Sequence, residues 1–221
     1  MERSKLKGFA MSSKTPKIYC AGPLFNPKER EDMANIAAVL EHANYSVFLP
    51  QRDGLELARL LPILTEKNIS KEDASIVLNN AIFSLDVFEV IDSDGVILNI
   101  NGRVPDEGAM VEAGIAWAHE KPIVIFKNDD RSLIQGNCNP LVMGLADFEF
   151  IDKYENIPIA LEEKLSKLNK NNGTPKKSSF STANEKGEAI RSYLMKQKTE
   201  NEIADLLISL FGEIVCQTLK E

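Results

Sequence analysis

Histidine, cysteine and tryptophan are scarce in this chain of 221 residues, which contains two, three and one of them. The cysteines Cys20, Cys138 and Cys216 are far apart and odd in number. This argues against a disulfide framework and a zinc cluster, and it is typical of a reducing compartment. Because the only histidines are His42 and His119, histidine-based triads and metal sites are not expected either.

Two phosphate-binding fingerprints are also missing. No G-x-G-x-x-G motif follows the first expected strand, and no Walker loop occurs anywhere in the chain. The Ala-Gly-Pro turn at 21–23 is short, and Pro23 has no N–H to donate, so a dinucleotide-binding nest is not expected there. The same turn reads equally well as a tight connection between a strand and a helix.

Positive charge and long apolar runs are scarce as well. The formal net charge is −7 and the sequence pI is about 5.1, so a nucleic-acid backbone is not expected as a partner. No apolar run comes close to the roughly 20 residues that span a bilayer. Residues 1–16 carry lysines but no hydrophobic stretch, which favours a disordered tail over a signal peptide. The sequence therefore predicts a cytoplasmic protein without a membrane partner.

Expected strands and helices alternate along the chain. Helices are expected at 27–43 and after Ser70, where Ser70 can cap the helix start and Asp73 follows three residues later. This alternation is typical of parallel βαβ units. It predicts a flavodoxin-like or Rossmann-like three-layer sandwich with a parallel five-stranded sheet. The five expected strands lie at 17–20, 45–49, 95–100, 123–126 and 148–151.

The composition divides the chain after this α/β domain, which we place at 17–166. Residues 167–186 are rich in Asn, Lys, Ser, Thr and Gly, and they predict a flexible linker or insertion. Helical periodicity returns at 187–221, so a helical C-terminal extension is expected. Such a segment would dock on the core or on another subunit.

Polar side chains gather where the expected strands end. In an open parallel sheet, ligands bind beyond the carboxyl ends of the strands, so these side chains are expected to converge. Loops are polar in any case, which is the plainer interpretation of each residue taken alone. The residues near or after the ends of the four main strands are Tyr19, Phe25, Gln51, Arg52, Asp53, Asn99, Asn101, Asp106, Asn128, Asn137 and Asn139.

The segment 106–118 is the most informative one. Asp106 stands at a loop-to-helix junction, and Glu112 lies within an otherwise small and apolar stretch. Glu112 could be an exposed helix residue and Asp106 a simple helix cap. Burying a carboxylate in such a stretch nevertheless costs free energy unless the group is paired, so a buried carboxylate there suggests a function. Two acids near one helix start suggest a site that handles a polyol or a sugar.

The order of these residues resembles that of the nucleoside 2-deoxyribosyltransferases. The resemblance covers about residues 17–152, and its most specific part is the Asp-x-Gly-x-x-x-Glu-x-Gly element at 106–114. The other segments support it by their order and spacing. They are Lys-Ile-Tyr-Cys-Ala-Gly-Pro-Leu-Phe at 17–25, Leu-Pro-Gln-Arg-Asp at 49–53, Asp86, and Lys-Pro at 121–122.

The resemblance implies three catalytic residues. Glu112 corresponds to a nucleophile that attacks the anomeric carbon of a 2-deoxyribose, and Tyr19 to the tyrosine that orients this carboxylate. Asp86 corresponds to the acid that protonates the departing base. A lone Asp in a long helix lies more often on a solvated face, so Asp86 is also open to that interpretation.

The resemblance also implies substrate-binding residues. Asp106 corresponds to a carboxylate that holds a sugar hydroxyl, and Gln51 to the residue that faces the base. Asn139 corresponds to an asparagine that completes the site of a neighbouring subunit, which implies a homo-oligomer. Gly22 and Phe25 are placed beside the substrate as well, although packing is the favoured interpretation of Phe25 taken alone.

The implied activity is base exchange between a 2-deoxyribonucleoside and a free purine or pyrimidine base, a reaction of nucleoside salvage. Cleavage of the N-glycosidic bond develops oxocarbenium character, which an adjacent carboxylate can stabilise and trap covalently. A carboxylic acid kept partly neutral by burial can protonate the leaving base. This chemistry requires no cofactor.

Two alternatives remain open from the sequence. One is a hydrolase that acts on 2-deoxynucleoside 5-monophosphates, although Asp106 and Glu107 would repel a phosphate and only Arg103 is close to them in sequence. The other is a non-catalytic nucleotide-sensing module, because fold does not dictate function.

Overall fold

The computed structural model describes residues 15–67, 70–102, 105–129, 138–170 and 179–218. Most of the tail expected at 1–16 therefore lies outside the described residues. The contacts divide the chain into two units, Met1–Lys170 and Asn171–Glu221, and each is described by itself.

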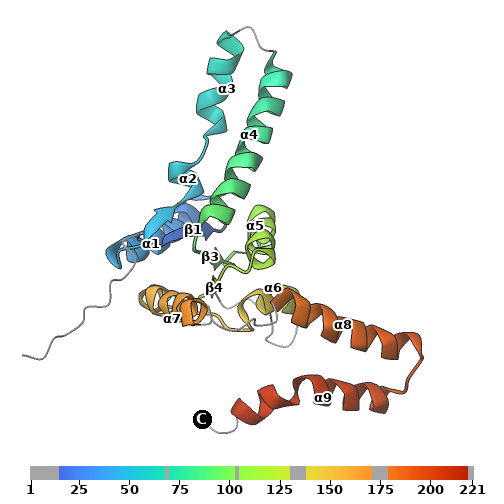
Figure 1. Ribbon diagram of the computed structural model, residues 1–221. Helices are drawn as coiled ribbons and strands as arrows, with labels where there is room; N and C mark the ends of the chain where they lie inside the picture. Colours follow the sequence, from blue (N-terminus) through green and yellow to red (C-terminus); the bar gives the residue numbers. More distant parts are fainter. Residues whose placement is uncertain (1–14, 68–69, 103–104, 130–137, 171–178, 219–221) are drawn as a thin grey trace, which may run out of the picture. The chain divides into compact units, whose positions relative to one another are not determined.

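The first unit is built around a four-stranded parallel sheet in the order β2-β1-β3-β4 (Figure 1). Each strand connects to a parallel neighbour, so all carboxyl ends lie at one edge of the sheet. This confirms the predicted parallel α/β fold. The strands are β1 (Lys17–Ala21), β2 (Ser46–Phe48), β3 (Gly95–Asn99) and β4 (Ile123–Phe126).

The fifth strand predicted at 148–151 is not formed. Asp147 and Phe148 adopt left-handed backbone conformations, with φ of 59° and 66°, which interrupt an extended chain. Only an isolated bridge joins Ile151 to Phe126 beside β4. The alternating apolar residues there gave the appearance of a strand, but the backbone turns before pairing can extend.

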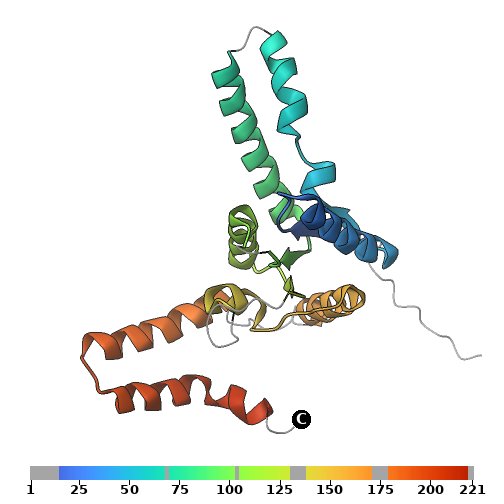
Figure 2. The same cartoon turned by 180° about the vertical axis from the view of Figure 1, so that it is seen from behind.

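Helices cover both faces of the sheet, which makes three layers (Figure 2). On one face, α1 (Pro27–His42) and α7 (Ile157–Lys170) bury a cluster with alternate strand residues. On the other face, the C-terminal turn of α4 (Lys71–Asp92) and the helix α5 (Glu107–Ala118) bury a second cluster. The short elements are α2 (Pro50–Asp53), α3 (Leu57–Glu66), α6 (Pro140–Met143), η1 (Gly144–Ala146) and η2 (Tyr154–Asn156).

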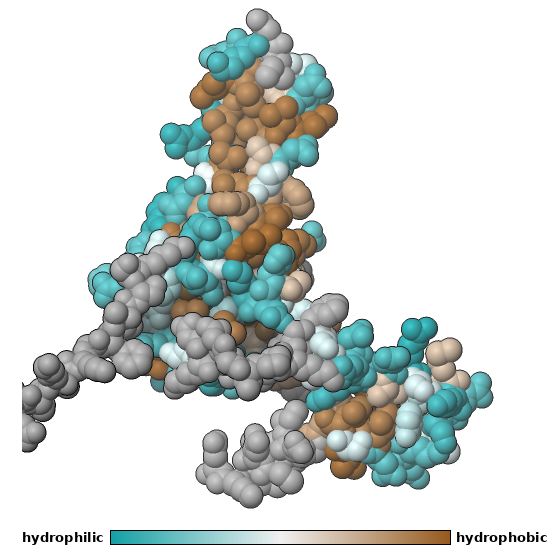
Figure 3. Space-filling view, in the orientation of Figure 1, coloured by the Kyte–Doolittle hydropathy of each residue, from teal (hydrophilic) through white to brown (hydrophobic). Residues whose placement is uncertain are grey.

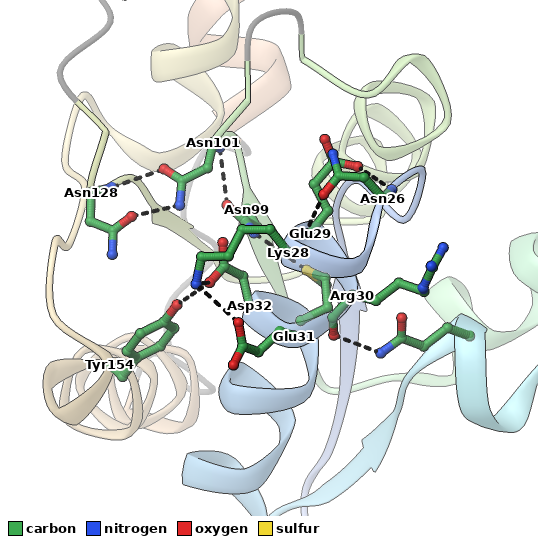
Figure 4. A network of polar contacts seen from close by, with 12 residues as sticks. Asn26, Lys28, Glu29, Arg30, Glu31, Asp32, Asn99, Asn101, Asn128 and Tyr154 are labelled. Carbon is green, nitrogen blue, oxygen red and sulfur yellow. Dashed lines mark hydrogen bonds and ion pairs between the residues drawn. The ribbon is translucent and has the colours of Figure 1, made fainter.

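Asn26 fixes the start of α1 just after the first strand. Its side chain accepts a hydrogen bond from the backbone N–H of Glu29, and the Glu29 carboxylate accepts bonds from the backbone N–H groups of Asn26 and Phe25 (Figure 4). This reciprocal arrangement is a capping box, and Pro27 occupies the first helical position. The cap therefore sets the direction in which the chain leaves β1.

A helical hairpin, α3 and α4, extends away from the sheet (Figures 1 and 2). Ser70 caps α4 through a bond from the backbone N–H of Asp73, at 3.1 Å, as the sequence predicted. The preceding helix α3 was not predicted. Among the described residues, α4 is also the one helix long and apolar enough to cross a bilayer by length and composition. This corrects the expectation that no apolar run approaches that length, although core helices of soluble proteins pass the same test.

The second unit contains two helices, α8 (Ser179–Met195) and α9 (Glu200–Thr218). Within it, the Lys186 ammonium lies 4.4 Å from the ring centroid of Phe211. The linker expected at 167–186 is helical at both ends, because α7 continues through Lys170 and α8 begins at Ser179. Residues 171–178 lie outside the described residues.

We expect Asn26→Ala to lower the free energy of unfolding by about 1 kcal/mol, because it removes the side-chain cap of α1. For a domain of this size, the melting temperature should fall by roughly 2–4 °C, measured by circular dichroism. Lys153→Ala is the control, since Lys153 precedes η2 without capping it through its side chain. Equal melting temperatures for the Asn26→Ala variant and the wild type would contradict this role.

Candidate active site

A cavity of about 750 Å³ lies where the carboxyl ends of β1 and β2 meet α4 and the start of α5. It brings together six of the predicted site residues, namely Gly22, Phe25, Gln51, Asp86, Asp106 and Glu112. A cavity of this size is in the range that holds small-molecule ligands. The other lining residues are Leu24, Pro50, Arg52, Gly54, Leu55, Glu56, Leu57, Arg59 and Ile82.

Tyr19 and Glu112 form the central contact of this site. The Tyr19 hydroxyl donates a hydrogen bond of 2.7 Å to Oε1 of Glu112, 93 residues later in the chain. Tyr19 is fully buried in β1, and its ring stacks on Phe48 of β2 with centroids 5.5 Å apart. The phenol is thus held by the sheet, while Glu112 reaches it from α5 and also borders the cavity.

The electrostatics of Glu112 suit a group that changes charge near neutrality. The pKa of Glu112 is raised to about 7: burial is the main cause, the hydrogen bond from Tyr19 opposes it, and the charges of Asp86 and Asp106 add to the rise. Burial and the charge of Glu112 raise the pKa of Tyr19, so the phenol stays protonated and remains a donor. Perturbed groups of this kind cluster at functional sites.

Asp86 provides a second carboxyl group with a raised pKa. It is half-buried on α4 and lines the cavity one turn after Ile82. Burial raises the pKa of Asp86, and the charge of Glu89 adds to the effect. The position of Asp86 is therefore not the solvated helix face that remained open from the sequence.

Asp106 caps α5 and lines the same cavity. Its Oδ1 accepts a bond of 2.6 Å from the backbone N–H of Ala109. The carboxylate also lies at the positive end of the helix dipole, which favours its charge. Capping and substrate binding are thus both open to this residue.

Gly22 allows the chain to pass close to α1 at the edge of the cavity. A Cβ at this position would lie 2.5 Å from Sδ of Met33 and 2.9 Å from Cβ of Asn99. These distances are too short, so any larger residue would force the turn away from the helix. The glycine is needed for this close approach.

Gln51 and Phe25 line the more open part of the cavity. Gln51 donates through Nε2 to the backbone carbonyl of Arg30, at 3.0 Å, and the Phe25 side chain is 78% exposed. The exposure of Phe25 argues against the interpretation that it is only a packing residue.

Arg52 holds the short helix α2 in place beside the cavity. Its guanidinium pairs with Asp53 at 2.9 Å and with Glu41 at 2.7 Å. Asp53 in turn accepts a bond of 2.9 Å from the backbone N–H of Leu49, at the end of β2. The sequence grouped Arg52 and Asp53 with the site, but only Arg52 lines the cavity.

The three asparagines expected near the site bind one another instead. Asn101 donates to Asn128 at 2.7 Å and accepts from its backbone at 2.9 Å, and the backbone N–H of Asn101 donates to Asn99 (Figure 4). These hydrogen bonds join the loop after β3 to the loop after β4, and the three asparagines do not line the cavity. Asn139 caps α6 with an exposed side chain, away from the cavity lining. Asn137 and Arg103 lie outside the described residues.

Sequence reasoning missed the contribution of α3 and the loop before it. Leu55, Glu56, Leu57 and Arg59 all line the cavity. Leucines at 57, 60, 61 and 64 recur at helical spacing and could have indicated the helix. Pro62 lies inside it, however, and a proline in the interior of a segment argues against a helix there.

Metal-binding groups do not gather in the part of the chain that the structure describes, where no three His, Cys, Asp or Glu residues are arranged to hold an ion. Of the cysteines, Cys20 is buried in β1 and Cys138 is half-buried, and both are free thiols.

Several solved structures are similar to this fold. A conserved protein from Enterococcus faecalis V583 shares 20% identity and a TM-score of 0.51, covering 68% of this chain and 99% of its own. A 2-deoxyribosyltransferase from Bacillus psychrosaccharolyticus shares 20% identity with a TM-score of 0.48, covering 64% and 90%. A CMP N-glycosidase from Clostridium botulinum shares 17% identity with a TM-score of 0.38, covering 69% and 98%. At these identities, the first similarity supports the fold alone.

No protein of curated function matches the sequence. The sequence profile described as nucleoside 2-deoxyribosyltransferase matches residues 18–176, which is well over half of the chain. That span includes Tyr19 in β1, Asp86 in α4, and Asp106 and Glu112 at the start of and within α5. The chain therefore belongs to the nucleoside 2-deoxyribosyltransferase family.

Proposed function

We propose that this protein is a nucleoside 2-deoxyribosyltransferase that exchanges the base of 2-deoxyribonucleosides through a covalent deoxyribosyl-glutamate intermediate. The observation that carries the proposal is the half-buried Glu112 carboxyl, which accepts a 2.7 Å bond from Tyr19 and shares one cavity with Asp86. A nucleophile held by a donor, with a second acid nearby, is the arrangement that glycosyl transfer requires.

In the first half-reaction, the ionised Glu112 attacks the anomeric carbon of the sugar. The N-glycosidic bond breaks, the base leaves with the bonding electron pair, and Asp86 supplies the proton that neutralises it. The sugar becomes an ester of Glu112. The raised pKa of Asp86 supports this role, because burial favours the protonated form of the carboxyl group.

In the second half-reaction, a nitrogen of the incoming base attacks the same carbon from the opposite side. The ester bond breaks, Glu112 leaves as a carboxylate, and Asp86 takes up the proton that the incoming base releases. Each displacement inverts the anomeric carbon, so the product retains the original configuration. The enzyme returns to its starting protonation state without a cofactor.

Tyr19 has a positioning role in this mechanism. Its hydrogen bond stabilises the charged form of Glu112 against the effect of burial. It also leaves one carboxylate oxygen oriented by the phenol, so the other oxygen can face the sugar. Without this donor, more of Glu112 would be protonated and unable to attack.

The remaining cavity residues would hold the substrate. Asp106 would accept a hydrogen bond from a sugar hydroxyl, and Gln51 and Phe25 would contact the base, one by its amide and the other by its ring. Gly22 would leave room for the sugar at the end of β1. Asn139, which does not line the cavity of its own subunit, would complete the site of a second copy.

A second candidate is hydrolysis of 2-deoxynucleoside 5-monophosphates. It is favoured by Arg52 and Arg59, two positive side chains that line the cavity and could attract a phosphate. Arg52, however, is already paired with Glu41 and Asp53, and Asp106 and Glu112 contribute negative charge at the same cavity.

The two reactions differ in their products. We expect a deoxynucleoside incubated with a second free base to give a new nucleoside, with free sugar as a minor product when the acceptor base is omitted. Chromatography of the reaction mixture measures both. Free sugar as the main product in the presence of acceptor, with a 5-monophosphate preferred over the nucleoside, would assign the protein to the hydrolases.

The carboxylate of Glu112 is the direct test of the mechanism. We expect Glu112→Gln to reduce base exchange on the order of 10³-fold or more, because the amide keeps the shape of the side chain but cannot attack. Glu107→Gln is the matched control, since Glu107 is exposed in the first turn of the same helix. Exchange is measured by chromatography, and folding by circular dichroism.

Undiminished exchange by a folded Glu112→Gln protein would refute covalent catalysis at this residue. Binding of a deoxynucleoside without turnover, equal in the wild type and in Glu112→Gln, would instead favour a nucleotide-sensing module.

The pH dependence of kcat/KM tests the role of Tyr19. Since the nucleophile must be ionised, activity should fall as the pH drops through about 7, the pKa of Glu112. Tyr19→Phe removes the bond that favours the charged carboxylate, so the pKa should rise and this limb should move up by roughly one pH unit. Tyr154→Phe is the control, because Tyr154 donates to Asp32 at 2.9 Å outside the cavity. An unmoved limb in Tyr19→Phe would show that the phenol does not tune Glu112.

A further inference from the structure

Three acids follow one another at intervals of three residues in the last two turns of α4. Asp86 lines the cavity, and Glu89 and Asp92 come after it. Figure 3 shows hydrophobic residues along the α3–α4 hairpin, so this part of the chain offers few counter-charges. No Lys or Arg occurs from residue 72 to residue 92. A cation that pairs with these acids therefore has to come from another element.

Lys17, the first residue of β1, provides that cation. Its ammonium group forms an ion pair with Glu89 and a second one, at 2.7 Å, with Asp92. The side chains of Lys17 and Glu89 are only 22% and 13% exposed, so water screens this pair poorly. Burial lowers the pKa of Lys17, but its hydrogen bonds and charge interactions with Asp92 and Glu89 outweigh this effect and raise the pKa overall. The ammonium group therefore stays charged.

The backbone of β1 fixes the position of Lys17. Its N–H donates to Oδ2 of Asp94 at 2.8 Å, and the N–H of Asp94 donates to the carbonyl of Lys17 at 2.7 Å. Because side chains alternate along a strand, Lys17 and Tyr19 lie on the same face of the sheet. One face of β1 thus provides a hydroxyl for Glu112 and a cation for Glu89.

Glu89 is close enough to Asp86 to influence its ionisation. The two residues are three positions apart on α4, which makes them neighbours on the helix surface, and like charges at this spacing repel. Burial is the larger cause of the raised pKa of Asp86, and the charge of Glu89 adds to it. Asp92 is six positions from Asp86, about 9 Å along the helix axis, and so is not its neighbour.

We propose that Glu89, held by Lys17, is a positioning residue for proton transfer, because its negative charge one turn from Asp86 favours the protonated form of that acid. An aspartic acid with an ordinary pKa is almost entirely ionised at neutral pH and is then a poor proton donor. Lys17 stabilises the Glu89 carboxylate in a place where burial disfavours a charge. The inference rests on the proposed function, in which Asp86 gives its proton to the leaving base.

Other charged groups surround Asp86, from α5, α2 and α3. They line the same cavity and are Glu112 and Asp106 of α5 and its cap, Arg52 of α2, Glu56 before α3, and Arg59 within α3. From β1, the Tyr19 hydroxyl donates to Glu112. A substitution at Glu89 leaves all of these groups in place. A change in the titration of Asp86 would therefore report the charge of Glu89.

NMR titration of the full chain, with aspartate labelled at the side-chain carboxyl carbon, measures this effect directly. The Asp86 signal is the one missing from an Asp86→Asn protein. Glu89→Gln should lower the titration midpoint of Asp86 by roughly half a pH unit, because it removes a neighbouring negative charge. Asp92→Asn is the matched control: Asp92 pairs with the same ammonium group but lies two turns from Asp86, so the midpoint should not move.

Exchanging the two charges separates the sign of the charge from the pairing itself. The double variant Lys17→Glu, Glu89→Lys keeps an ion pair between β1 and α4 but places a positive charge beside Asp86. The midpoint should then fall further than in Glu89→Gln. If the pair has only a structural role, the double variant should titrate like the wild type. That result, or an unmoved midpoint in Glu89→Gln, would overturn the inference.

Base exchange at a pH above the midpoint connects this charge to the reaction. Lowering the midpoint by half a unit reduces the protonated fraction of Asp86 about threefold, so Glu89→Gln should exchange bases about threefold more slowly, and Asp92→Asn at the wild-type rate. A lowered midpoint with undiminished exchange would overturn the role in proton transfer. A wild type that exchanges no bases would contradict the proposed function, whereas the NMR midpoints would still decide whether Glu89 acts on Asp86.

Discussion

The hydrogen bond between Tyr19 and Glu112 is the interaction on which the site depends. A carboxyl group is costly to take out of water, and this one is held by a phenol that the sheet buries completely. The contact is possible because α5 presents small residues, Ala109, Ala113 and Ala116, to the sheet, which lets the helix lie close to β1. Glu112 lies three residues after Ala109 and four before Ala116, on the same side of α5, so these small neighbours let its carboxyl group reach the phenol of Tyr19.

The parallel sheet explains why the acids meet. The carboxyl ends of its strands lie at one edge. Residues after β1, in α2 after β2, and at the start of α5 after β3 therefore line the same cavity. Asp86 comes from α4, which crosses back over this edge. Burial raises the pKa of both Asp86 and Glu112. In the proposed reaction the two acids have different roles: Glu112 is the nucleophile, and Asp86 transfers the proton to and from the base.

The α3–α4 hairpin connects this site to the surface. One side of it lines the cavity, and another exposes large apolar side chains such as Phe83 and Phe88. Exposed apolar side chains that gather in this way usually mark an interaction site. Within the family, the chain combines a compact α/β domain with this extension and with a second helical unit after Lys170.

The sequence by itself determined the local features: the strands at 17–20 and 123–126, the caps by Ser70 and Asp106, and the unusual position of Glu112 in an apolar helix. These follow from hydrophobic periodicity and cap chemistry, which act over a few residues. Only the tertiary structure decided that residues 148–151 do not pair as a strand and that residues of α3 line the cavity. It also decided that the asparagines at 99, 101 and 128 form hydrogen bonds with one another. Such outcomes depend on backbone turns and on contacts between residues far apart in the chain, which local patterns do not encode.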